Sequence, residues 1–156
     1  MPETKPLETI VERMATADVR YVTTIGTDGY PRTHAMLNLR NREQYPDQVK
    51  LYAELNRDLM VYIATTTSSA KKMELDSNPR ICVYFCHPSE FFGVSLVGDA
   101  ELIEDMAAKE APWVDWWSRY DPTGLPDDPD FTVFRLFPKE ARGWNQGETF
   151  AIELPA

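Results

Sequence analysis

Cysteine, histidine and basic residues are scarce in this sequence, and each shortage excludes a class of protein. The 156 residues include two cysteines and two histidines, so neither a disulfide scaffold nor a metal site rich in these residues is expected. Acidic residues outnumber basic ones by 25 to 16, which gives a formal net charge of −9. That charge argues against general binding to nucleic acids or membrane surfaces, because both need a basic field. It does not exclude one local cationic pocket.

Long apolar runs are also absent. No segment approaches the roughly 20 apolar residues that a membrane-spanning helix needs. The opening segment, MPETKPLETIVERM, lacks a basic stretch followed by an apolar one, so it does not fit a secretory signal. We therefore expect a cytoplasmic protein with free, buried or half-buried thiols at Cys82 and Cys86.

The remaining composition is that of a globular protein. Apolar residues make up 43% of the chain and aromatic residues 12%, so wholesale disorder is not expected. The sequence shows no internal repeat, low-complexity tract or linker. A chain of this length therefore fits one domain spanning residues 1–156.

Periodicity and turn signals predict strands with a few peripheral helices. The apolar residues of PLETIVERMATAD are at helical spacing, which predicts a short helix over residues 6–17. Asp28-Gly29 separates two β-rich runs and predicts an antiparallel hairpin of residues 19–26 and 31–40. A helix of about two turns is expected before Asn78-Pro79. The other predicted elements are strands at 59–65, 80–87 and 91–105, a helix at 106–120 broken at Pro112, one or two closing strands over 131–154, and a strand or an excursion at 51–55.

This order of elements favours an antiparallel sheet, because neighbouring strands join mostly without long crossovers. Six or so strands in a chain of this length are best closed as a small barrel, since closure removes exposed edges. A Rossmann-like parallel sheet is not expected, because TIGTDGYP is a hairpin rather than a glycine-rich nucleotide-binding turn. The predicted fold class is therefore mainly β with peripheral helices.

The segment IATTTSSAKKMELDSNPR concentrates polar and basic side chains where a strand gives way to a helix. Residues 65–69 all carry hydroxyl groups, and Lys71 and Lys72 follow in the first helical turn. A helix N-terminus binds anions, and lysines there are unfavourable for the helix unless an anion is present. The segment alone fits either a phosphate site or an ordinary N-cap at Ser68 or Ser69 with solvent-facing lysines.

The second strand of the predicted hairpin carries another basic group. Its alternation puts one set of side chains on a shared face, which is either a solvent face or one wall of a polar pocket. Two basic groups on one small sheet suit a single phosphate-bearing ligand. The residues of this face are Arg32, His34, Met36, Asn38 and Arg40.

Three motifs in order resemble a known family. DGYPRTHAMLNLRN, IATTTSSAKKMELDSNPRICVYF and GVSLVGDAELIED resemble the pyridoxamine 5′-phosphate oxidase-like, FMN-binding split-barrel superfamily. The likeness is greatest to its bacterial general-stress branch and runs from about residue 8 to residue 144. The resemblance implies a six-stranded antiparallel split β-barrel that works as a homodimer, with FMN held at the subunit interface.

The resemblance also implies which residues bind the cofactor. Thr65, Ser69 and Lys71 would line the phosphate and ribityl chain, residues 34–39 would run beside the flavin, and Trp144 would approach the partner's flavin. No catalytic residue and no metal ligand is assigned. The cofactor-binding residues expected are Arg32, His34, Ala35, Met36, Asn38, Ala64, Thr65, Ser69, Lys71, Lys72 and Trp144.

The chain departs from the family pattern at His34, Leu39 and Ala70, where basic residues are common. The resemblance implies an FMN-dependent oxidoreductase that passes hydride or electrons between a reduced nucleotide and a small acceptor. A non-enzymatic, stress-related flavin-binding protein is the alternative, and the same fold with a deazaflavin or haem is another. Pyridoxamine 5′-phosphate oxidation itself is the least expected activity, because of the altered basic positions.

Overall fold

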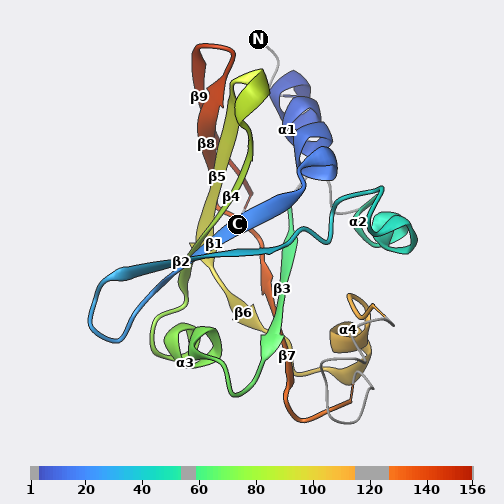
Figure 1. The fold of residues 1–156 in the computed structure, drawn as a ribbon, viewed down its shortest axis with the longest axis vertical. Coiled ribbons are helices and arrows are strands. Elements are labelled where there is room, and N and C mark those ends of the chain that lie inside the picture. The colour runs from blue at the N-terminus through green and yellow to red at the C-terminus, as the bar shows by residue number, and fades with distance from the viewer. Residues whose placement is uncertain (1–3, 54–58, 115–126, 156) are drawn as a thin grey trace.

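The structure is a computed structural model that describes residues 4–53, 59–114 and 127–155. Two antiparallel sheets make up most of this described part (Figure 1). All pairs between described strands are antiparallel, so the mainly β, antiparallel fold predicted from the sequence is confirmed. The larger sheet has the order β2 (Pro31–Leu37), β1 (Val19–Ile25), β4 (Arg80–His87), β5 (Phe92–Asp99), β8 (Glu140–Asn145) and β9 (Glu148–Glu153). The smaller one has the order β3 (Val61–Thr66), β7 (Phe131–Leu136) and β6 (Glu101–Leu102).

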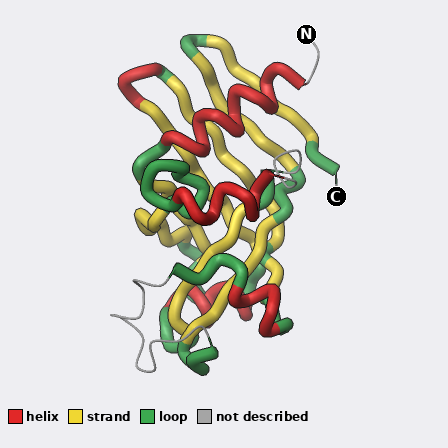
Figure 2. Tube along the Cα trace, turned by 90° about the vertical axis from the view of Figure 1, so that its right-hand side faces the viewer, coloured by secondary structure: helices red, strands yellow, loops and turns green. Residues whose placement is uncertain are grey.

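Within the described ranges, four α-helices lie around these sheets. They are α1 (Thr4–Thr16), α2 (Val49–Ala53), α3 (Ala70–Ser77) and α4 (Met106–Glu110). Helix α1 runs along the strands of the larger sheet, and α3 connects β3 to β4 (Figures 1 and 2). Among the described residues, no helix is long and apolar enough to cross a membrane.

Alternation along β3 divides the apolar interior into two clusters. Val61 and Ile63 point into the main core, which Ile10 of α1 also enters. Met60 and Tyr62 belong to a second cluster with Leu39, Tyr45, Tyr52, Ile103, Phe131 and Val133. Because successive strand side chains face opposite ways, one short strand separates the two clusters.

The predicted hairpin is present, but its second strand is shorter than expected. Gly29 has φ +85°, a conformation that favours glycine, and the turn leads into full pairing from Val19–Leu37 to Ile25–Pro31. The prediction of a strand to residue 40 was wrong at its end, because the chain turns inward after Leu37. Asn38 Nδ2 donates to the carbonyls of Met14 at 2.7 Å and Ala17 at 2.9 Å.

The single long strand predicted over residues 91–105 was also wrong. The chain leaves the larger sheet after β5, and β6 then pairs with β7 in the smaller sheet. Ala100, between them, donates its N–H to the Pro79 carbonyl at 2.7 Å. Residues 131–153 form three strands rather than one or two, and residues 49–53 form a helix. The helix predicted at 106–120 is observed only as α4, and its residues 115–120 lie outside the described part.

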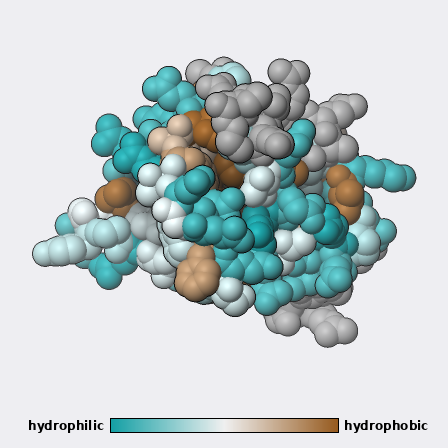
Figure 3. All heavy atoms as spheres, turned by 90° about the horizontal axis from the view of Figure 1, so that it is seen from above, coloured by the Kyte–Doolittle hydropathy of each residue, from teal (hydrophilic) through white to brown (hydrophobic). Residues whose placement is uncertain are grey.

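The surface seen in Figure 3 combines hydrophilic and hydrophobic residues. Seen from above, the molecule is largely hydrophilic, with separate apolar groups between polar ones (Figure 3).

Cys82 and Cys86 are free and half-buried on β4, as predicted. Burial raises the pKa of the Cys82 thiol, which the hydrogen bond with Ser95 partly offsets.

Candidate functional site

The junction of β3 and α3 is organised by hydroxyl groups. Ser69 is the N-cap of α3, and its Oγ accepts a hydrogen bond from the Lys72 N–H at 3.3 Å. The same Oγ lies 3.0 Å from Thr65 Oγ1. This pair connects the end of the strand to the start of the helix.

The five hydroxyl residues divide into two groups. Thr67 Oγ1 donates to the Pro129 carbonyl at 2.7 Å and lies 2.6 Å from Thr132 Oγ1. The Ser68 N–H donates to Asp130 Oδ1 at 2.9 Å. These two residues therefore attach the loop to the segment before β7. Thr65, Thr66 and Ser69 instead line a cavity.

The two lysines also differ. Lys72 forms an ion pair with Asp76 one turn further along α3 and does not line the cavity. Lys71 lines the cavity and forms no ion pair with any described residue. Of the two, Lys71 is the cation available to a ligand.

The cavity has a volume of about 510 Å³, within the range of small-molecule sites. Most of its wall is apolar, and the polar groups gather near the start of α3 and at one residue of β1. β2 is the terminal strand of the larger sheet, so its outer edge offers backbone N–H and C=O groups. The lining residues are Val19, Arg20, Ala35, Met36, Leu37, Leu39, Ala64, Thr65, Thr66, Ser69, Lys71 and Phe131.

Six of the eleven cofactor-binding residues expected from the sequence line this cavity. They are Ala35, Met36, Ala64, Thr65, Ser69 and Lys71. The other five are Arg32, His34, Asn38, Lys72 and Trp144, and they lie elsewhere in this chain.

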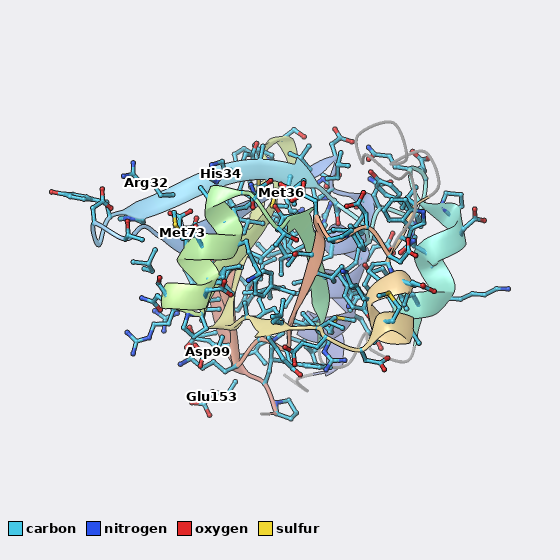
Figure 4. The ribbon with its side chains drawn as sticks, turned by 90° about the horizontal axis from the view of Figure 1, so that it is seen from below. Arg32, His34, Met36, Met73, Asp99 and Glu153 are labelled. Atoms are coloured by element: carbon cyan, nitrogen blue, oxygen red, sulfur yellow. The ribbon has the colours of Figure 1, made fainter. Side chains whose placement is uncertain are left out.

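Arg32 and His34 are exposed on β2. Figure 4 shows Arg32 near the hairpin end, with His34 and Met36 following along the strand toward the middle of the molecule. Arg32 forms an ion pair with Asp28 at 2.6 Å. His34 pairs with Val22, so both side chains share the face of the hairpin that carries Met36.

Asn38 and Trp144 have surroundings of their own. Asn38 is fully buried at the end of α1, where its side-chain oxygen also accepts the Arg40 N–H at 3.1 Å. Trp144 is 37% exposed on β8, opposite Gly93, with its ring centroid 6.4 Å from that of Phe91. Any contact of Trp144 with a ligand would have to be made outside this cavity.

Arg20 is a charged cavity residue that was not expected from the sequence. Its side chain is 2% exposed, and burial lowers the pKa of its guanidinium to about 10. Val22 and Thr24, on the same face of β1, are also buried. The sequence offered no signal for Arg20 beyond its place on a predicted strand, because its burial is known only from the structure.

The arrangement suits an elongated ligand that carries a phosphate. A helix N-terminus, two hydroxyl groups and one uncommitted lysine lie at one end of an apolar cavity. Apolar walls such as Met36, Leu37 and Phe131 suit a flat ring system.

Comparison with known proteins places this chain in a family. The family model described as pyridoxamine 5′-phosphate oxidase matches residues 7–145, and the chain belongs to that family. General stress protein 26 of Bacillus subtilis is 25% identical to it over 99 residues, covering 62% of this chain and 69% of that one. A Clostridium acetobutylicum protein related to general stress protein 26 has a solved structure with a TM-score of 0.72 and 27% identity, covering 96% of this chain and 94% of that one.

Two more distant structures share the fold. A pyridoxamine 5′-phosphate oxidase-related, FMN-binding protein of Nostoc punctiforme has a TM-score of 0.64 and 14% identity, covering 100% of this chain and 98% of that one. A haem-binding protein of Mycobacterium smegmatis has a TM-score of 0.67 and 18% identity, covering 94% of this chain and 57% of that one. The fold therefore occurs in proteins described with different ligands.

Proposed function

We propose that this protein binds FMN and passes hydride or electrons between a reduced nucleotide and a small acceptor. The observation that carries the proposal is Lys71, a cation without an ion pair to any described residue, lining the cavity beside Thr65 and Ser69. Family membership supports FMN as the phosphate-bearing ligand.

The residues of the cavity fit FMN in both its parts. Lys71 and the Ser69 and Thr65 hydroxyls would hold the phosphate at the start of α3. Met36 and Leu37 would lie beside the ring, and the free edge of β2 offers backbone groups to its polar atoms. FMN, when bound, supplies the redox chemistry, and the protein supplies binding, orientation and exclusion of water.

A homodimer with FMN at the subunit interface is part of the proposal. Leu37 lines the cavity and is still 44% exposed, and Val19 beside it is 37% exposed. Exposed apolar groups at the rim of a site suit contact with a second subunit. Trp144, Arg32 and His34 remain proposed cofactor residues in that arrangement, through the partner's site or the outer part of their own.

A non-enzymatic, stress-related flavin-binding protein is the alternative. The cavity has one lysine without an ion pair at the expected phosphate position. The three positions where the family commonly has basic residues hold an exposed histidine, His34, and two uncharged residues, Leu39 and Ala70. Fewer cations at the phosphate are the reason to keep this alternative. Haem receives less support from this chain, because neither of its two histidines lines the cavity. His87 Nε2 instead lies 2.9 Å from the Arg13 carbonyl oxygen and 3.1 Å from Thr16 Oγ1.

The test is a flavin absorbance spectrum of the purified protein, followed by NADH or NADPH without air. We expect a bound flavin spectrum, or uptake of added FMN with quenched fluorescence, and bleaching by one of the nucleotides. Bound FMN that neither nucleotide reduces would favour the non-enzymatic alternative. A protein that ignores FMN would contradict the proposal.

A further inference from the structure

Arg20 is a buried cation that faces the cavity. Every second side chain of β1 is buried, and Arg20 shares this buried face with Val22 and Thr24. Its side chain is 2% exposed, and it forms part of the cavity wall. It lies opposite Met36 in the hairpin, so both side chains are on the same face.

The polar atoms of this side chain are not used to hold the described part of the fold together. The Arg20 side chain has no hydrogen bond or ion pair with any described residue, and its Nε is buried without a partner. Arg40, buried nearby, provides the contrast. Its Nε and Nη2 donate to the Met60 carbonyl at 2.9 and 2.7 Å, and its guanidinium lies 4.5 Å from the Tyr52 ring centroid.

A buried, unpaired charge is costly, so its presence requires a compensating group. Burial lowers the pKa of Arg20, and the Tyr52 and Tyr45 phenols offset this only in part. At neutral pH the guanidinium is still charged. Uncompensated charges inside proteins destabilise the fold, and they occur where a ligand supplies the opposite charge.

Arg20 enters the cavity from β1, whereas Lys71 enters it from α3. Thr24 Oγ1 donates to Glu74 Oε1 of α3 at 3.3 Å, which fixes that part of β1 against the helix. Arg20 is four residues earlier on the same face, roughly 13 Å along the strand from Thr24. The two available cations therefore come from different elements of the cavity wall, β1 and the start of α3.

We propose that Arg20 is a second anion-binding point, so that the cavity binds negative charge at two places. A phosphate would lie at Lys71, which rests on the proposed function, and another anionic oxygen group would lie at Arg20. Two sources fit this chemistry. One is the ring of FMN, which gains negative charge when it takes up two electrons and one proton. The other is the carboxylate or phosphate of a second small molecule.

The first test compares the stability of Arg20→Met and Arg40→Met in the ligand-free protein by urea unfolding. Because the Arg20 side chain makes no hydrogen bond with a described residue, Arg20→Met should leave the unfolding equilibrium constant unchanged or lower it. Arg40→Met removes hydrogen bonds to a buried carbonyl and should raise that constant at least about tenfold. A rise in Arg20→Met as large as that in Arg40→Met would overturn the proposal by showing a structural role.

The second test uses FMN-loaded protein, with Arg142→Gln as a control at an exposed arginine. If the anion is the reduced ring, Arg20→Met should lower the preference for reduced over oxidised FMN about tenfold, or about 30 mV for a two-electron couple. If it is a second molecule, acetate or inorganic phosphate should perturb the flavin spectrum at concentrations about tenfold higher in Arg20→Met than in the original protein. No change in either measurement overturns the proposal. If the original protein takes up no FMN, the proposed function fails, while the stability comparison still tests Arg20.

Discussion

The hydroxyl oxygens of Thr65 and Ser69 lie 3.0 Å apart, across the loop that joins β3 to α3. Ser69 at the same time caps the helix by accepting the Lys72 N–H. One side chain therefore serves both the local fold and the wall of the cavity. Substitutions at Ser69 are able to separate these two roles.

Ser69→Ala should remove both roles, and Ser69→Asp only one. The alanine loses the cap, which costs about 1 kcal/mol of stability, and it removes a donor to the ligand. The aspartate is an equally good cap but brings a negative charge to the phosphate end. We expect Ser69→Asp to keep the unfolding free energy within about 0.5 kcal/mol and to weaken FMN at least about tenfold, as measured by denaturation and flavin titration.

Ser68→Ala is the matched control, because Ser68 contacts Asp130 and does not line the cavity. Its FMN affinity should remain within about twofold of the original protein, a difference of about 0.4 kcal/mol. Tight FMN binding by Ser69→Asp would be evidence against a phosphate at this helix end.

His34→Arg should strengthen FMN binding if the exposed β2 position is near the phosphate. His34 shares the face of the hairpin that carries Met36, a cavity residue, and arginine provides more hydrogen-bond donors than imidazole. We expect an increase in affinity of about three- to tenfold in a fluorescence titration, because water at this exposed position reduces a charged hydrogen bond to about the strength of a neutral one.

Thr33→Arg adds the same charge on the opposite face of β2, where Thr33 Oγ1 lies 2.8 Å from Thr23 Oγ1. It therefore controls for a general gain of positive charge. Equal effects of the two arginines would rule out a specific contact at His34.

Tyr52→Phe should change how stability depends on alkaline pH. Burial raises the pKa of Tyr52 to about 12, an effect that Arg20 and Arg40 reduce. The folded pKa of Tyr52 exceeds the unfolded value of about 10. The contribution of protonated Tyr52 to the free energy of unfolding is therefore complete below pH 10 and is lost as the pH rises toward 12. In urea unfolding at high pH, the Tyr52→Phe variant should lose up to about 2 kcal/mol less of its unfolding free energy than the original protein does.

At pH 7 the same substitution should be neutral or slightly stabilising. Tyr52 Oη is buried without a hydrogen-bond partner among the described residues, so its removal leaves no broken bond. Tyr30→Phe, at a side chain that is 70% exposed, should match the original protein at every pH. An unchanged alkaline profile in Tyr52→Phe would show that Tyr52 does not ionise differently in the folded state.

Local signals in the sequence were sufficient for much of the fold. The Asp28-Gly29 turn, the N-cap near Ser69 and the stop at Asn78-Pro79 all depend on neighbouring residues, and all are present. Residues 91–105 are divided between two sheets because β5 pairs with β8 and β6 pairs with β7. The spacing of apolar residues within a segment does not predict which distant strand it will pair with. The inward turn at Asn38 likewise depends on carbonyls of α1.

The candidate site was predictable to a similar degree. The strand-to-helix segment indicated Ser69 and Lys71, and both line the cavity. The sequence did not separate Lys71 from Lys72, because the ion pair with Asp76 is a matter of side-chain geometry. Arg20 was missed because a lone arginine on a strand becomes notable only once its burial is known.

A phosphate site at Lys71 is tested most directly by the affinity of FMN and riboflavin for the original protein and for Lys71→Ala, with Lys72→Ala as the control. Only FMN carries the phosphate, so Lys71→Ala should weaken FMN at least about tenfold and leave riboflavin within about twofold. Lys72→Ala, which removes a lysine paired with Asp76, should have little effect on either ligand. Equal losses for FMN and riboflavin in Lys71→Ala, or no FMN binding by the original protein, would contradict a phosphate site at the start of α3.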